Sequence, residues 1–174
     1  MSAARTRAPT LEQVMAQALA IERAAVERYD ALADVMEVHN NSAVTALFRK
    51  MAQIERRHAE QILREMGWKS AAAAPAPVAA WGAADAPESV PEDEIHYLMW
   101  PWHALQLALA AERRAEAFFA EVAESASSED VRRVALQLRN EEREHVVLVQ
   151  RWLERTPEPG TDWADDPDPP RYTD

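Results

Sequence analysis

The chain has 174 residues, of which 48% are hydrophobic and only three are glycine, a composition that favours one compact, mostly helical domain. Its formal net charge of −11 argues against nucleic acid as a partner, and the absence of cysteine excludes disulfides, thiolate metal sites and a fused rubredoxin-type iron module. The N-terminal segment is polar and no apolar run follows it, so we expect no signal peptide, no membrane partner and a cytoplasmic location.

The first half of the chain contains two helical patterns. Thr10 and Gln13 have the spacing of a capping box, which predicts a helix that begins there and runs to about residue 37. A short polar break at 39–42 leads to a second helix, which we expect to stop near Gly67. Because the break is short, these two helices should form an antiparallel hairpin.

The second half repeats this arrangement after a long connection. Residues 69–99 are rich in Ala and Pro and have no helical amphipathicity, so we expect a crossover there. A third helix is predicted from about Pro101, and Trp100 and Trp102 are interpreted as core residues that anchor the crossover. Ser127 is the expected N-cap of a fourth helix.

The crossover decides the predicted topology. A helix of about 26 residues is about 39 Å long, and about 30 residues can return over that length. The third helix can therefore run parallel to the second, which gives two antiparallel hairpins joined by one long crossover. We expect this bundle to occupy residues 10–154, followed by an acidic, Pro-rich tail over 155–174 that is extended or disordered.

Polar residues interrupt the apolar stripe of every predicted helix. The stripes of the first and third helices pass through one carboxylate each, Glu22 and Glu112. The second and fourth helices each contain a Glu-x-x-His pair, Glu55 with His58 and Glu142 with His145. All four carboxylates lie about a dozen residues from a predicted helix start, so the topology above brings them to one level in the middle of the bundle.

Four carboxylates in an apolar core need compensation, because desolvation costs several kcal/mol per ion and mutual repulsion adds to it. Two divalent cations would balance four carboxylates and two neutral imidazoles, and oxygen with imidazole suits iron or manganese. One Glu-x-x-His pair alone is more often part of a solvated helix face. Two such pairs with two mid-stripe glutamates at matching heights favour a metal centre formed by all six residues.

These motifs carry a resemblance to a known family. They are E-x6-Y from Glu22 to Tyr29, ERRH at 55–58, Glu112 within AAERRAEAFF, and EREH at 142–145. Over residues 10–154 the chain resembles the ferritin-like superfamily of di-iron carboxylate proteins, most closely the rubrerythrin group. The resemblance implies an all-α, ferritin-like four-helix bundle that binds two iron ions, with manganese as the alternative metal.

The resemblance also implies a role for each residue. Glu55 and Glu142 would bridge the two metals, Glu22 and Glu112 would be terminal ligands, and His58 and His145 would each bind one metal. Tyr29 is a candidate to hydrogen-bond a ligand carboxylate. One feature departs from the family: rubrerythrins carry an additional glutamate one turn away in the third helix, where this chain has Ala115 at +3 and Leu109 at −3 from Glu112, with Glu116 at +4.

The implied function is that of a di-iron oxidoreductase, which oxidises a diferrous site with hydrogen peroxide or oxygen and protects against peroxide and ferrous iron. Because the chain has no cysteine, an external electron donor is expected, and the resemblance suggests a homodimer. Two alternatives stay open. One is a ferroxidase or iron-handling protein, and the other is a non-enzymatic helical interaction module with a structural metal or none.

Overall fold

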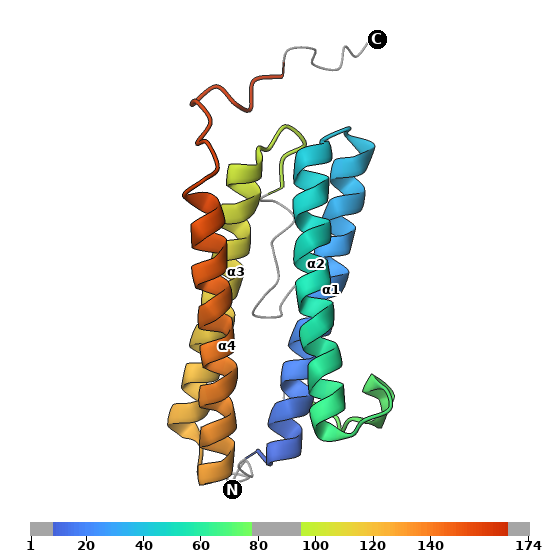
Figure 1. The fold of residues 1–174 in the computed structure, drawn as a ribbon, viewed down its shortest axis with the longest axis vertical. Coiled ribbons are helices and arrows are strands. Elements are labelled where there is room, and N and C mark those ends of the chain that lie inside the picture. The colour runs from blue at the N-terminus through green and yellow to red at the C-terminus, as the bar shows by residue number, and fades with distance from the viewer. Residues whose placement is uncertain (1–8, 78–94, 167–174) are drawn as a thin grey trace, which may run out of the picture.

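The computed structural model describes residues 9–77 and 95–166. Its helices are α1 (Leu11–Val38), α2 (Ser42–Met66), the one-turn 3-10 helix η1 (Ala71–Ala73), α3 (Pro101–Ser125) and α4 (Glu129–Leu153). No strand occurs in these two ranges. Helices α1 and α2 pack as one hairpin and α3 and α4 as a second (Figure 1). The predicted all-α, four-helix architecture is confirmed.

Local interactions at the helix ends explain where the helices begin and stop. The Thr10 hydroxyl accepts a hydrogen bond from the Gln13 N–H at 3.2 Å, and the Gln13 side chain accepts one from the Thr10 N–H at 2.9 Å, so the predicted capping box is present. Gly67 ends α2 in the left-handed conformation, with φ of 67°. The prediction of Ser127 as N-cap of α4 was wrong by one residue. Ser128 occupies that position without a side-chain capping bond, so nothing in the local sequence distinguished the two serines.

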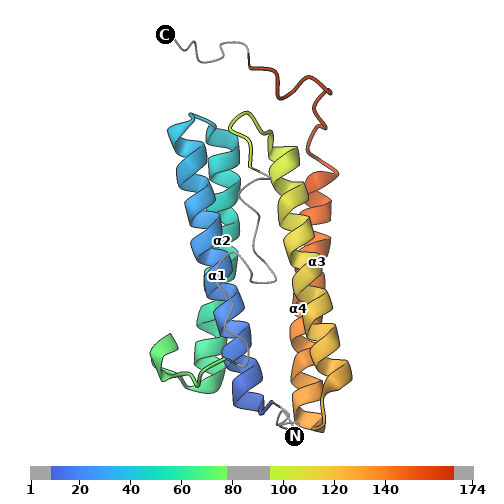
Figure 2. The same cartoon turned by 180° about the vertical axis from the view of Figure 1, so that it is seen from behind.

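The direction of the helices confirms the expected topology. Figures 1 and 2 show α1 and α4 running one way and α2 and α3 the other, so α3 is parallel to α2. Asn41 helps to fix this arrangement, because its side chain accepts from the Val44 N–H and donates to the Met99 carbonyl at 2.6 Å. It thereby ties the α1–α2 turn to the residues that lead into α3. Residues 78–94 of the expected crossover lie outside the described residues.

The environment of the two tryptophans differs from the prediction. Trp100 is 48% exposed and Trp102 is only partly buried, whereas Met99 is buried in the core. The prediction failed because Trp100 precedes the first turn of α3 and so lies off its apolar stripe. Trp163, from the segment after α4, packs against this end of the core instead, with its ring centroid 3.9 Å from that of His103.

The core consists of two apolar clusters separated by a polar level. The upper cluster in Figure 1 includes Met36, Phe48, Leu105 and Val149, and the lower cluster includes Met15, Ile62, Phe119 and Leu138. In each helix, one stretch of residues belongs to the upper cluster and another to the lower cluster, and a buried glutamate lies between the two stretches. Helix packing therefore places four acids at the same height. None of the helices in the described ranges has the length and hydrophobicity of a transmembrane span.

Candidate metal centre

Every helix of the bundle contributes one buried carboxylate to the polar level. The four are between 1% and 4% exposed, namely Glu22 on α1, Glu55 on α2, Glu112 on α3 and Glu142 on α4. The two histidines of the Glu-x-x-His pairs face the same level from α2 and α4. Their side chains are 28% exposed for His58 and 12% exposed for His145, so the site is shielded but reachable from the α2/α4 side.

Donor atoms from these residues form two overlapping groups of three. Glu55, His58 and His145 each offer one ligand atom within 4.8 Å of the others, and so do Glu112, Glu142 and His145. The structure thus brings five of the six predicted ligands into groups that could hold a metal ion. The sixth, Glu22, has a carboxylate oxygen 3.7 Å from His58 Nδ1 and therefore borders the first group.

The contacts repeat between the two hairpins. His58 Nδ1 lies 3.2 Å from a Glu55 oxygen, and His145 Nδ1 lies 3.2 Å from a Glu142 oxygen, each along its own helix. His145 Nδ1 is also 3.3 Å from a Glu112 oxygen on the neighbouring helix. The two imidazole rings stack with centroids 4.3 Å apart and join the hairpins at this level. The i, i+3 spacing on a helix is what directs each carboxylate and its histidine to the same place.

Burial and mutual interaction raise the affinity of this site for protons. Burial raises the pKa of Glu112 to about 8, with a further contribution from the charge of Glu55 and an opposing one from His145. Burial alone would lower the pKa of His145, but its contacts with Glu112 and Glu142 outweigh this effect and raise the pKa to about 11. A metal ion that binds here must therefore displace protons.

The donor set fits a divalent cation. Glu55 Oε1 is buried and has no hydrogen-bond partner among the described residues. A buried carboxylate oxygen without a partner is unfavourable by about 1–3 kcal/mol or more. A cation would remove this penalty, and a ligand set of carboxylates with imidazole suits iron or manganese.

Other residues considered from the sequence lie outside these groups. Tyr29 is buried and stacks on Phe48 in the upper cluster, with ring centroids 6.0 Å apart, so its predicted hydrogen bond to a ligand stays a prediction. Ala115 is fully buried, so the position one turn from Glu112 provides no carboxylate. Glu116 is partly buried and belongs to neither group.

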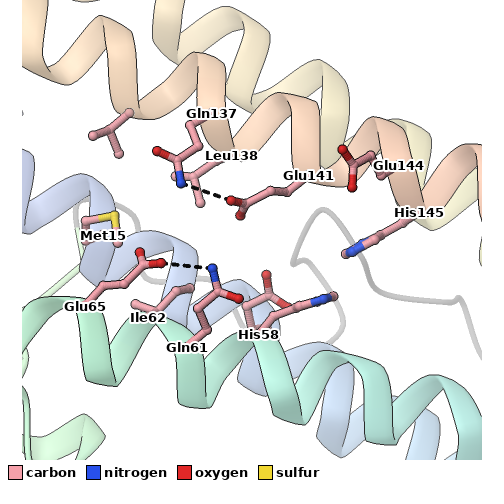
Figure 3. A pocket seen from close by; sticks show the side chains of 12 residues that line it. Met15, His58, Gln61, Ile62, Glu65, Gln137, Leu138, Glu141, Glu144 and His145 are labelled. Carbon is pink, nitrogen blue, oxygen red and sulfur yellow. Dashed lines mark hydrogen bonds and ion pairs between the residues drawn. The ribbon is translucent and has the colours of Figure 1, made fainter.

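The structure also places acidic residues next to the site that could not be assigned to it from the sequence. A hollow of about 310 Å³ opens between α2 and α4 next to the two histidines (Figure 3). Its lining includes Glu65, Glu141 and Glu144, of which Glu141 and Glu144 look like part of a solvated helix face in the sequence. In the sequence, Glu65 and Glu141 share one feature, a Gln four residues earlier in the same helix. This spacing is too common in helices to indicate a site by itself.

A four-helix bundle with buried carboxylate and histidine groups at its centre defines a ferritin-like protein with a candidate metal site. Residues 13–153 match the rubrerythrin family model, and the chain belongs to the rubrerythrin family, whose members typically bind iron. An uncharacterised conserved protein from Magnetospirillum magnetotacticum MS-1, known from a crystal structure, is 34% identical, with a TM-score of 0.67. The similarity covers 87% of this chain and 99% of that one. No curated protein matches the chain.

Proposed function

We propose that the protein is a non-haem di-iron oxidoreductase of the rubrerythrin type. The ligands of the two iron ions are Glu22, Glu55, His58, Glu112, Glu142 and His145. The observation that carries this proposal is the meeting of four buried carboxylates and two histidines at one level, where Glu55 Oε1 has no hydrogen-bond partner among the described residues. When bound, the iron pair supplies the redox chemistry, in which hydrogen peroxide or oxygen oxidises the diferrous state.

The contacts support a division of roles among the ligands. Glu22 lies beside His58, and Glu112 lies beside His145, so each hairpin offers one histidine and one carboxylate to an ion of its own. Glu55 directs Oε2 to His58 and has no hydrogen-bond partner at Oε1 among the described residues, and Glu142 directs Oε2 to His145 at 3.2 Å. The oxygen of Glu55 that His58 does not engage would allow this carboxylate to bind both ions, and we assign the same role to Glu142, the equivalent residue of the second hairpin.

The surrounding chain sets the dielectric environment and the protonation of the site. The apolar clusters above and below the polar level lower the local dielectric constant, which strengthens electrostatic interactions among the ligands. Glu112 and His145, with their raised pKa values, hold protons that loading with metal releases. Since the chain has no cysteine, we propose that an external electron donor reduces the site. We also propose that the protein is a homodimer, which sedimentation velocity would test.

A ferroxidase is the second candidate function. Two observations favour it: the residue beside Glu112 is the buried Ala115 instead of an additional carboxylate, and acidic side chains surround the hollow next to the histidines. In this alternative, ferrous iron is the substrate and oxygen the preferred oxidant. The six residues at the centre would be the same.

An anaerobic titration of the metal-free protein with ferrous iron, followed by stopped-flow mixing with peroxide or oxygen, tests both candidates. We expect saturation at two irons per chain and faster oxidation by peroxide. Faster oxidation by oxygen would favour the ferroxidase. Manganese in the same titration compares the two metals. No saturable binding would contradict both proposals and favour a helical interaction module.

A further inference from the structure

The hollow between α2 and α4 leads from the surface to the proposed ligands. Its floor contains Glu22, His58 and His145, and its inner wall contains the buried side chains of Met15 and Ile62. Its rim is polar and is formed by Gln61, Glu65, Gln137, Glu141 and Glu144. Figure 3 shows the side chains of α2 and α4 facing one another across this space. The hollow is therefore continuous with the candidate metal centre.

Two matched hydrogen bonds hold the rim carboxylates. Gln61 donates to Glu65 at 2.9 Å along α2, and Gln137 donates to Glu141 at 3.1 Å along α4 (Figure 3). A glutamine amide is neutral, so it orients the carboxylate without cancelling its charge. No lysine or arginine is among the residues that line this hollow, all of which the structure describes. The rim therefore has a negative charge.

A second hollow reaches the same two histidines but has a different charge. It also lies along α2 and α4, and it is lined by Arg143 and Arg151 together with apolar residues that include Val147. Glu144 lies between the two openings and borders both. A doubly charged cation is attracted to the first opening and is repelled by the arginines of the second.

We infer that the acidic hollow is the route by which ferrous ions reach the centre, and that Glu65, Glu141 and Glu144 select and accelerate their passage. This inference rests on the proposed function, because it assigns an access route to the same site. The rim carboxylates act on the rate of loading, since they lie outside both groups of candidate ligands. A charged cleft of this kind raises the association rate of an oppositely charged ion by about 10-fold to 1000-fold.

The test compares loading rates of full-length variants with equal net charge. The rim variant is E65Q/E141Q/E144Q, and the control is E27Q/E60Q/E121Q, which alters three exposed glutamates that line none of the hollows described above. Cobalt(II) is mixed anaerobically with metal-free protein at low ionic strength, and its visible absorbance reports loading without oxidation. We expect the rim variant to load about tenfold more slowly than the control. Both should reach two ions per chain, and the difference should shrink in high salt.

Steric variants decide between the two openings. Val134→Phe enlarges a partly buried residue of the acidic hollow, and Val147→Phe enlarges an exposed residue of the second one. We expect only Val134→Phe to slow loading. Equal loading by all variants, or slowing by Val147→Phe alone, would overturn the inference while leaving the proposed function intact. If the unmodified protein fails to bind two ions at equilibrium, the proposed function fails and the access route fails with it.

Discussion

Single buried charges set the balance between stability and binding in this bundle. Glu55 is 1% exposed and lies in the polar level between two apolar clusters, where an uncompensated carboxylate opposes folding. The same carboxylate stabilises the protein only when it binds a cation. We therefore expect substitutions that abolish metal binding at this position to stabilise the metal-free protein.

Glu55→Gln tests this trade-off while keeping the side-chain volume. We expect the metal-free variant to be at least as stable as the unmodified protein, because a buried charge is removed. Saturating ferrous iron should stabilise the unmodified protein by about 2.7 kcal/mol at 100 times the dissociation constant, but should leave the variant unchanged. Anaerobic thermal unfolding followed by circular dichroism measures both effects. Glu60→Gln, an exposed change on the same helix, should keep the iron-dependent increase.

Proton binding by Glu112 and His145 predicts a pH dependence of the metal-free protein. Their folded-state pKa values, about 8 and about 11, exceed the ordinary values of 4.5 and 6.5, so the folded state holds more protons than the unfolded state between these limits. The contribution to stability is complete below the ordinary values and is lost as the pH rises through 8 and then 11. We expect the free energy of unfolding to fall from pH 6 to pH 9, by up to about 1.4 kcal/mol per pH unit for each proton.

Urea denaturation at several pH values measures this slope. In Glu112→Gln the titrating carboxyl is absent, so the decrease between pH 6 and pH 9 should become smaller. Iron-dependent stabilisation should show the opposite trend and grow with pH, because metal and protons compete for the same atoms. A free energy of unfolding that rises with pH in the metal-free protein would contradict the assignment of raised pKa values.

At the level of the helices, the capping residues at the helix ends are the clearest local determinants of structure. Gly67 terminates α2 at φ of 67°, a conformation that costs an L-residue about 1–2 kcal/mol. A Cβ atom at this position would meet nothing within 4 Å, so the effect of a substitution comes from the backbone alone. This isolates a helix-capping effect from packing.

We therefore expect Gly67→Ala to lower the free energy of unfolding by about 1–2 kcal/mol. Gly67→Asn should lower it less, because asparagine tolerates the left-handed region better than alanine. Urea denaturation of the two variants side by side measures the difference. Equal stability of Gly67→Ala and the unmodified protein would mean that the chain ends α2 in another conformation.

At the level of the whole molecule, the segment after α4 packs on the end of the bundle. Trp163 lies against His103 and His96, and the Tyr97 hydroxyl donates a hydrogen bond to Asp166. These contacts join residues 160–166 to the segment that leads into α3. We expect the bundle to keep its fold without these contacts, because each hairpin packs mainly through its own helices.

Trp163→Ala should release this segment without unfolding the bundle. We expect faster proteolytic cleavage between residues 155 and 166, with a change in melting temperature of only a few degrees. Limited proteolysis with mass spectrometry identifies the cleavage site. His103→Ala should have the same effect, since it removes the ring on which Trp163 stacks. Unchanged cleavage rates in both variants would contradict a holding role for this contact.

The sequence by itself determined the helices, the hairpin pairing and the candidate ligands, because these follow from local periodicity, capping residues and the i, i+3 spacing of Glu55 with His58 and of Glu142 with His145. It did not determine the burial of Trp100 or the N-cap of α4, where two neighbouring positions are locally equivalent. Only the tertiary structure decided that the histidine rings stack across the hairpins, that one opening to them is acidic and the other contains arginines, and that Trp163 packs on the end of the bundle. These features depend on the relative placement of helices distant in the chain, which packing sets and which local sequence does not encode.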